Sequence, residues 1–164
     1  MELKKFTRLS MLLALSVVLN IVENMIPIFS GTMVPGVKLG LANIVILFVL
    51  YKYTFKDALF LSIIRVFLVG ILRTGVFSVA FWFSIGGSLL SITAMYIAKK
   101  LTKLSLVGIS IIGSIFHSVG QIIVTSIFLG SSSAFYYLPI ILLFAIPTGI
   151  ITGIISKELV KYFD

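Results

Sequence analysis

The sequence has no cysteine, one histidine and few acidic residues, with Asp and Glu together contributing 5 of 164 residues. Without cysteine the chain can form no disulfide, no thiolate metal site and no cysteine nucleophile. A single histidine makes a zinc centre built on imidazole ligands equally implausible. No G-x-x-x-x-G-K-[ST] phosphate loop occurs, so ATP hydrolysis by that route is excluded. We therefore expect no enzymatic activity, no metal and no cofactor.

Charge of either sign is also scarce, since 11% of the residues are charged and 60% are hydrophobic. An average globular domain carries about 25% charged and about 45 to 50% apolar residues. A chain this short could not cover so much apolar surface with a polar shell in water. This composition indicates an integral membrane protein, for which the bilayer supplies the missing apolar solvent.

Long apolar runs separated by turn residues predict an all-α, polytopic protein with about six transmembrane helices in a single domain, residues 1–164. The expected helices cover residues 6–26, 39–53, 58–72, 76–97, 104–129 and 135–155. The second is short, because 15 residues at about 1.5 Å each do not reach across a hydrocarbon core of about 30 Å.

The basic residues lie mainly in the termini and in alternate connections, which sets an orientation through the positive-inside rule. An amino terminus in the cytoplasm leaves only Lys38 and Arg73 outside. It collects on the inner side Lys4, Lys5, Arg8, Lys52, Lys56, Lys99, Lys100, Lys103, Lys157 and Lys161. We therefore expect a multi-pass protein of a prokaryotic plasma membrane with both termini in the cytoplasm.

The connection over residues 27–38 is rich in proline and glycine, yet too apolar for a free loop. Irregular backbone within a membrane is tolerated where it is buried in protein or lines a cavity. We expect this segment to dip into the outer half of the bilayer as the wall or lid of a pocket.

Polar side chains inside the predicted helices fall almost entirely in the outer half of the membrane. An ionisable group near a helix centre costs roughly 2.5 to 3.5 kcal/mol to insert, so it faces a partner or a wet cavity. The pattern predicts a polar cavity open to the outside, and its excess of basic groups favours a small anionic solute. The candidate substrate-binding residues are Glu23, Lys38, Asn43, Arg65, His117 and Gln121.

Two of these candidates have structural alternatives. Glu23 could form an ion pair with Arg65 or Lys38, and His117 could form an interhelical hydrogen bond.

Small residues four positions apart let membrane helices approach closely. The pairs Ser84 with Ser88, Ser110 with Ser114, and Gly149 with Gly153 are expected to pack the bundle internally. The pair Ser10 with Ala14, on the first helix, is the candidate for docking another membrane subunit.

Several runs resemble the Gx transporter family, whose members are often labelled heptaprenyl diphosphate synthase component I. These runs are Val34–Ile44, Phe55-Lys56-Asp57-Ala58, Gly86-Gly87 and His117-Ser118-Val119-Gly120-Gln121. The family in turn resembles the substrate-binding S components of energy-coupling factor (ECF) transporters. The resemblance implies a six-helix S-component bundle that holds a solute near the outer face. It also implies a membrane coupling subunit and two ATPases as partners.

Two other functions remain open. A noncatalytic membrane partner of a soluble prenyl synthase would bind that enzyme and no solute. A carrier driven by an ion gradient would depend on Glu23, since the other acidic residues lie at helix ends or tails. Synthase chemistry itself lacks ligands, because the only aspartates are Asp57 and Asp164 and a magnesium diphosphate site needs clustered carboxylates.

Overall fold

The computed structural model describes residues 2–25 and 40–163, whose regular structure is entirely helical. The α-helices are α1 (Glu2–Met25), α2 (Leu41–Lys52), α3 (Phe55–Val69), α4 (Val79–Leu101), α5 (Leu106–Leu129) and α6 (Leu138–Tyr162). A π-helical turn, η2 (Gly70–Thr74), continues α3, and a 3-10 helix, η3 (Ser132–Tyr137), leads into α6. The predicted dipping segment and Lys38 lie outside the described residues.

Four helical stretches are long and apolar enough to cross a membrane: Leu3–Met25, Val79–Leu101, Leu106–Leu129 and Ser132–Tyr162. The other two helices are shorter, with 12 residues in α2 and 15 in α3. At about 1.5 Å per residue they extend about 18 and 22 Å, less than a hydrocarbon core of about 30 Å. The protein is therefore an all-helical membrane protein with four candidate spans in its described residues. The 5 residues of η2 lengthen the helical stretch of α3, and the expected count of six transmembrane helices is not confirmed.

Local capping explains where the helices begin. In α3 the Thr54 hydroxyl accepts from the backbone N–H of Asp57, whose carboxylate accepts from the N–H of Thr54. Ser78 and Ser105 cap α4 and α5 in the same way through their hydroxyls. At the other end of the chain, α6 continues past the predicted limit of residue 155 to Tyr162. Hydropathy detects only the end of the apolar run, whereas α6 continues beyond that run through its polar last turns.

Glycine permits the close packing of α4 and α6 against α5. A Cβ on Gly120 would lie 2.6 Å from the backbone oxygen of Gly86, so neither helix could keep its place. A Cβ on Gly149 or Gly153 would lie 2.8 Å from a Cα atom of α5. The predicted internal packing of the Ser110 and Ser114 pair and of the Gly149 and Gly153 pair is confirmed, and the structure shows that the two pairs pack against each other.

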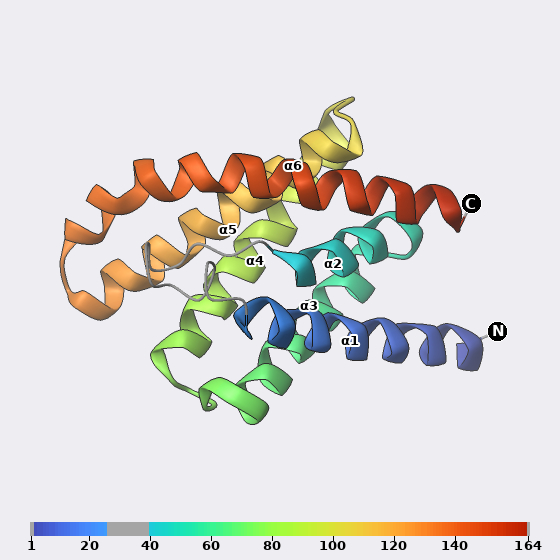
Figure 1. Ribbon diagram of the computed structural model, residues 1–164, viewed down its shortest axis with the longest axis horizontal. Coiled ribbons are helices and arrows are strands. Elements are labelled where there is room, and N and C mark those ends of the chain that lie inside the picture. Colours follow the sequence, from blue (N-terminus) through green and yellow to red (C-terminus); the bar gives the residue numbers. More distant parts are fainter. Residues whose placement is uncertain (1, 26–39, 164) are drawn as a thin grey trace.

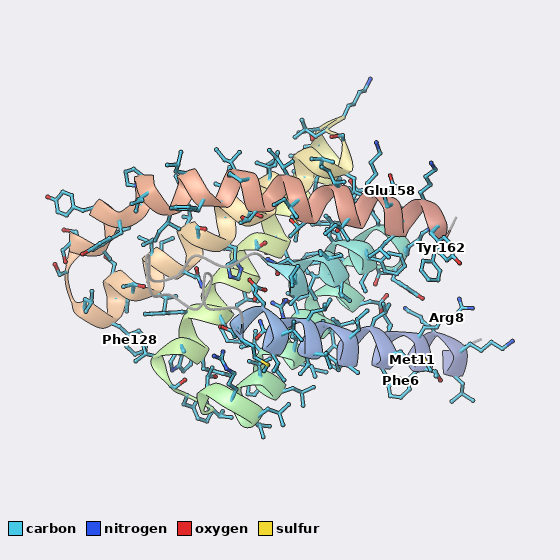
Figure 2. All side chains as sticks on the ribbon, in the orientation of Figure 1. Phe6, Arg8, Met11, Phe128, Glu158 and Tyr162 are labelled. Atoms are coloured by element: carbon cyan, nitrogen blue, oxygen red, sulfur yellow. The ribbon has the colours of Figure 1, made fainter. Side chains whose placement is uncertain are left out.

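Both chain termini lie at one end of the molecule, called here the terminal end (Figure 1). Arg8 of α1 and Glu158 and Tyr162 of α6 lie at this end, while Phe128 of α5 lies toward the opposite one (Figure 2). The main apolar core is built largely from α2, with the first turns of α3 and α5 and the last turns of α4 around it. Its most deeply buried side chains include Leu47, Val49 and Leu50.

Candidate functional site

A cavity with polar groups in its lining lies among the parts of the helices that are remote from the terminal end. Its described lining comes from the end of α1, the start of α2, the second half of α3, the first half of α4, the middle of α5 and the first half of α6. The cavity volume is about 50 Å³, room for a few water molecules or a compact solute. Its polar lining residues are Asn20, Glu23, Asn43, Arg65, Thr74, Ser84, Ser88, Ser114, His117, Ser118 and Thr148.

Arg65 is the cation of this described lining and is only 4% exposed. Its Nη1 donates to Oδ1 of Asn43 at 3.3 Å, and its Nη2 donates to the hydroxyl of Ser88 at 3.0 Å. Within the described residues no carboxylate oxygen lies within 4.0 Å of the guanidinium. The direct hydrogen bonds of this buried positive charge thus go to neutral oxygens of α2 and α4, while the Glu23 carboxylate of the same cavity acts on it through space without a direct ion pair.

Glu23, although 2% exposed, is engaged by the backbone of the next helix. Its two carboxylate oxygens accept from the N–H groups of Gly40 at 2.7 Å and Leu41 at 3.0 Å. Gly40 has φ +76°, a left-handed conformation that a residue with a side chain rarely adopts. Glu23 therefore caps the positive end of α2 across the helix interface. Of the two ion pairs given as alternatives for Glu23, a direct pair with Arg65 is not among the contacts of the described residues, although the two charges interact through space, and Lys38 lies outside those residues.

His117 reaches the cavity because α4 has no side chain opposite it. A Cβ on Gly87 would lie 2.9 Å from Cε1 of His117 and 3.1 Å from Cγ of Gln121. Gln121 is buried at this same helix contact but is not part of the described cavity lining. The structure thus brings together four predicted site residues, Glu23, Asn43, Arg65 and His117, and leaves Gln121 outside the cavity.

Ser88 contacts Arg65, but the sequence analysis did not identify it as a site residue. The Ser84 and Ser88 pair is predicted to pack the helices together, whereas both residues line the cavity and Ser88 is a hydrogen-bond partner of Arg65. Small residues four apart on one face occur at a helix contact and beside a cavity alike. A buried arginine on the preceding helix was the available signal, because it requires acceptors on its neighbours.

The lining combines its charged groups with hydroxyls and apolar side chains. The apolar side chains, called here the apolar wall, come from α2, α3, α4 and α6: Ala42, Val66, Val69, Phe81, Ile141, Phe144 and Ala145. Arg73, counted at the sequence level as a possible contributor of positive charge, is exposed and is not part of the described lining. Nowhere in the described ranges do three His, Asp or Glu side chains gather to hold a metal ion.

The predicted docking pair lies far from this cavity along α1. Ser10 and Ala14 are both exposed, as are Phe6, Met11 and Leu15 around them. This places the pair on an outward-facing, largely apolar surface of the first helix.

Fold and cavity together define a multi-pass helical membrane protein with a buried polar site. A family model described as heptaprenyl diphosphate synthase component I matches residues 12–159, and the chain belongs to this family. The resemblance noted from the sequence is thereby confirmed. Searches of curated proteins and of solved structures return no match to the chain.

Proposed function

We propose that this protein is the substrate-binding S component of an ATP-driven, ECF-type importer and that it binds a small anionic solute. The observation that supports this function is Arg65, buried on the cavity wall without a carboxylate partner among the described residues. Burying a guanidinium without a direct ion pair is costly even when a carboxylate lies in the same cavity, and such groups in membrane proteins mark sites with a function.

The contacts of Glu23 strengthen the case for an anionic solute. A free glutamate in the cavity would neutralise Arg65, but both Glu23 oxygens already accept from the α2 backbone. The N-terminus of α2 carries a partial positive charge that compensates this carboxylate. Glu23 offsets part of the charge of Arg65 through space but makes no direct contact with it, so the guanidinium N–H groups not used by Asn43 and Ser88 can bind the anionic group of a solute.

The importer role is supported by the resemblance of this family to S components, noted from the sequence, and by the placement of the cavity. The cavity lies away from the terminal end, which carries Lys and Arg residues on α1, α4 and α6. If the terminal end faces the cytoplasm, as the positive-inside rule requires, the cavity opens toward the outside. With no nucleotide-binding loop of its own, the protein would take its energy from partner ATPases through a coupling subunit, which we place on the exposed Ser10 and Ala14 face.

Purification from the host membrane tests this function. The tagged protein is extracted in mild detergent, and the proteins and small molecules that accompany it are identified by mass spectrometry. We expect a membrane coupling subunit, two ATPases and a small anion released on denaturation. A Ser10→Leu variant should lose the coupling subunit and keep the solute, whereas Leu104→Ala, an exposed position on another surface, should keep both.

The same purification separates the alternatives. Recovery of a prenyl synthase with neither ATPases nor a solute would replace the importer with a synthase partner. Solute uptake into liposomes that contain this chain alone, lost in Glu23→Gln, would indicate a carrier driven by an ion gradient.

A further inference from the structure

The hydrogen bonds of Arg65 determine which kind of chemical group the cavity can accept. A guanidinium has five N–H donors and no acceptor. In the described structure one donor bonds Oδ1 of Asn43 and another bonds the hydroxyl oxygen of Ser88. The remaining N–H groups of this side chain are therefore also available only as donors.

Asn43 and Ser88 each direct an acceptor oxygen at Arg65, which leaves their donor groups available to a solute. Asn43 uses its carbonyl oxygen for the guanidinium, which leaves its amide NH₂ group for other contacts. Ser88 uses an oxygen lone pair, which leaves its hydroxyl proton. Asn43, Arg65 and Ser88 come from α2, α3 and α4, and all three line the cavity. We call them the donor triad.

We infer that the donor triad selects a compact solute with a single ionised carboxylate and an apolar body. An ionised carboxylate is an acceptor-only group whose two oxygens match the planar guanidinium fork. A protonated acid or an amide would place an O–H or N–H donor against the N–H donors of the triad and lose part of this match. Asn43 and Ser88 are thus specificity-determining residues for the site that Arg65 anchors.

Charge distinguishes the carboxylate from phosphate. The described lining has one arginine, and the Glu23 carboxylate also lines the cavity. A dianion would gain attraction from a single guanidinium and would be repelled by Glu23 in a medium of low dielectric. The remainder of the solute meets the apolar wall, where Phe81 and Ile141 are buried, and this contact favours a hydrocarbon body over a sugar or nucleotide.

This inference rests on the proposed solute-binding function, and a substitution that preserves shape tests it. In Asn43→Asp the acceptor 3.3 Å from Arg65 becomes a carboxylate, which pairs with the guanidinium and repels a second anion. The matched control is Asn24→Asp, which adds the same charge on α1 outside the described lining. Ser88→Ala removes one donor, and Ser88→Thr restores it.

The measurement is the thermal unfolding midpoint, followed by Trp82 fluorescence in detergent at constant ionic strength, with increasing acetate, propionate or butyrate. Ligands that bind the folded state raise this midpoint according to their affinity. Propionamide, butyramide and inorganic phosphate are the comparison probes. We expect the carboxylates to bind the unmodified protein and Asn24→Asp about tenfold more tightly than amide or phosphate, since charged hydrogen bonds exceed neutral ones by roughly that factor.

We further expect Asn43→Asp to lose carboxylate binding while it unfolds at the same or a higher temperature, and Ser88→Thr to bind better than Ser88→Ala. The inference is overturned if no carboxylate stabilises the protein, if the amide or phosphate binds as tightly, or if Asn43→Asp still responds. The identity of the solute released from the host-purified protein distinguishes failure of the carboxylate inference from failure of the proposed importer function. A released cation or neutral compound overturns the carboxylate assignment and leaves solute binding intact, whereas the absence of both a solute and a coupling subunit overturns the importer itself.

Discussion

The two ends of this molecule bury different kinds of side chain. Toward the terminal end, α2 buries an almost uninterrupted run of apolar residues, Ile44–Leu50, against the neighbouring helices. At the cavity end the buried residues include a glutamate, an arginine and several hydroxyls. Apolar side chains need no specific partner when they pack, whereas each buried polar group needs a hydrogen-bond partner. The terminal end therefore stabilises the fold by apolar packing, and the cavity end is the place where we propose that a solute binds.

The largest expected loss of stability comes from a substitution in the apolar core at the terminal end. Leu47→Ala should lower the free energy of unfolding by about 2 to 5 kcal/mol, because the 1% exposed side chain leaves a void that its neighbours cannot fill. Thermal unfolding in detergent measures the loss, and butyrate affinity should stay unchanged. The control is Leu143→Ala at a position 68% exposed on α6. Equal effects of the two substitutions would contradict a packed core in α2.

Glu23→Ala should have the next largest effect, about 1 to 3 kcal/mol, because it leaves the N–H groups of Gly40 and Leu41 without their acceptor. Glu23→Gln keeps one oxygen and should lose less. The exposed Glu158 provides the matched control, and Glu158→Ala should change the unfolding midpoint little. A midpoint that is unchanged in Glu23→Ala would rule out the capping role and return Glu23 to the candidates for ion coupling.

The helical class and the internal packing of the small-residue pairs could be predicted because hydropathy and small-residue spacing are local properties. Which helices those pairs bring together could not be predicted, and the expected count of six transmembrane helices is not confirmed, because α2 alone is too short to span the membrane. Periodicity identifies a face that avoids water, and it does not distinguish lipid from a neighbouring helix. In α2 nearly every side chain faces protein, so a short helix carries a membrane-like sequence.

Replacing Arg65 by lysine tests the cavity end and should cost binding more than stability. Arg65→Lys keeps the positive charge but loses the planar fork that bonds both Asn43 and Ser88. We expect butyrate affinity to fall about tenfold, which corresponds to about 1.4 kcal/mol. The control is Arg73→Lys, an exposed arginine outside the described lining. A similar loss in both variants would mean that overall charge attracts the anion, without specific contacts.

The sequence predicted much of this site because polar residues are rare in the apolar segments. Asn43, Arg65 and His117 stand out for that reason, and the structure brings them to one cavity. The function of Glu23 as a cap could not be seen, since it depends on the backbone of a helix that begins 18 residues further along. Small-residue spacing alone could not separate Ser88 from the packing serines, and it took the buried Arg65 to single it out. His117 and Gln121 both lie against Gly87, and only the structure shows that His117 alone of the two lines the cavity.

The smallest effect concerns the surface of the terminal end, where charge replaces apolar packing. Asp57 lies 2.8 Å from the ammonium of Lys5 and also accepts from Thr54. Partial burial alone would raise the pKa of Asp57, but the hydrogen bonds from Lys5 and Thr54 hold that pKa below its usual value. Because the folded-state pKa is lowered, the stabilisation is complete above the unfolded value of about 3.9 and is lost as the pH falls below it.

We expect this contribution to be about 0.2 to 1 kcal/mol, since Lys5 is 43% exposed and water screens the pair. Unfolding midpoints measured from pH 6 down to about pH 3 should therefore fall less steeply in Asp57→Asn than in the unmodified protein. Lys5→Gln should remove part of this difference and leave the Thr54 hydrogen bonds in place. Identical pH slopes in all three proteins would show that the contacts of Asp57 with Lys5 and Thr54 do not stabilise the fold.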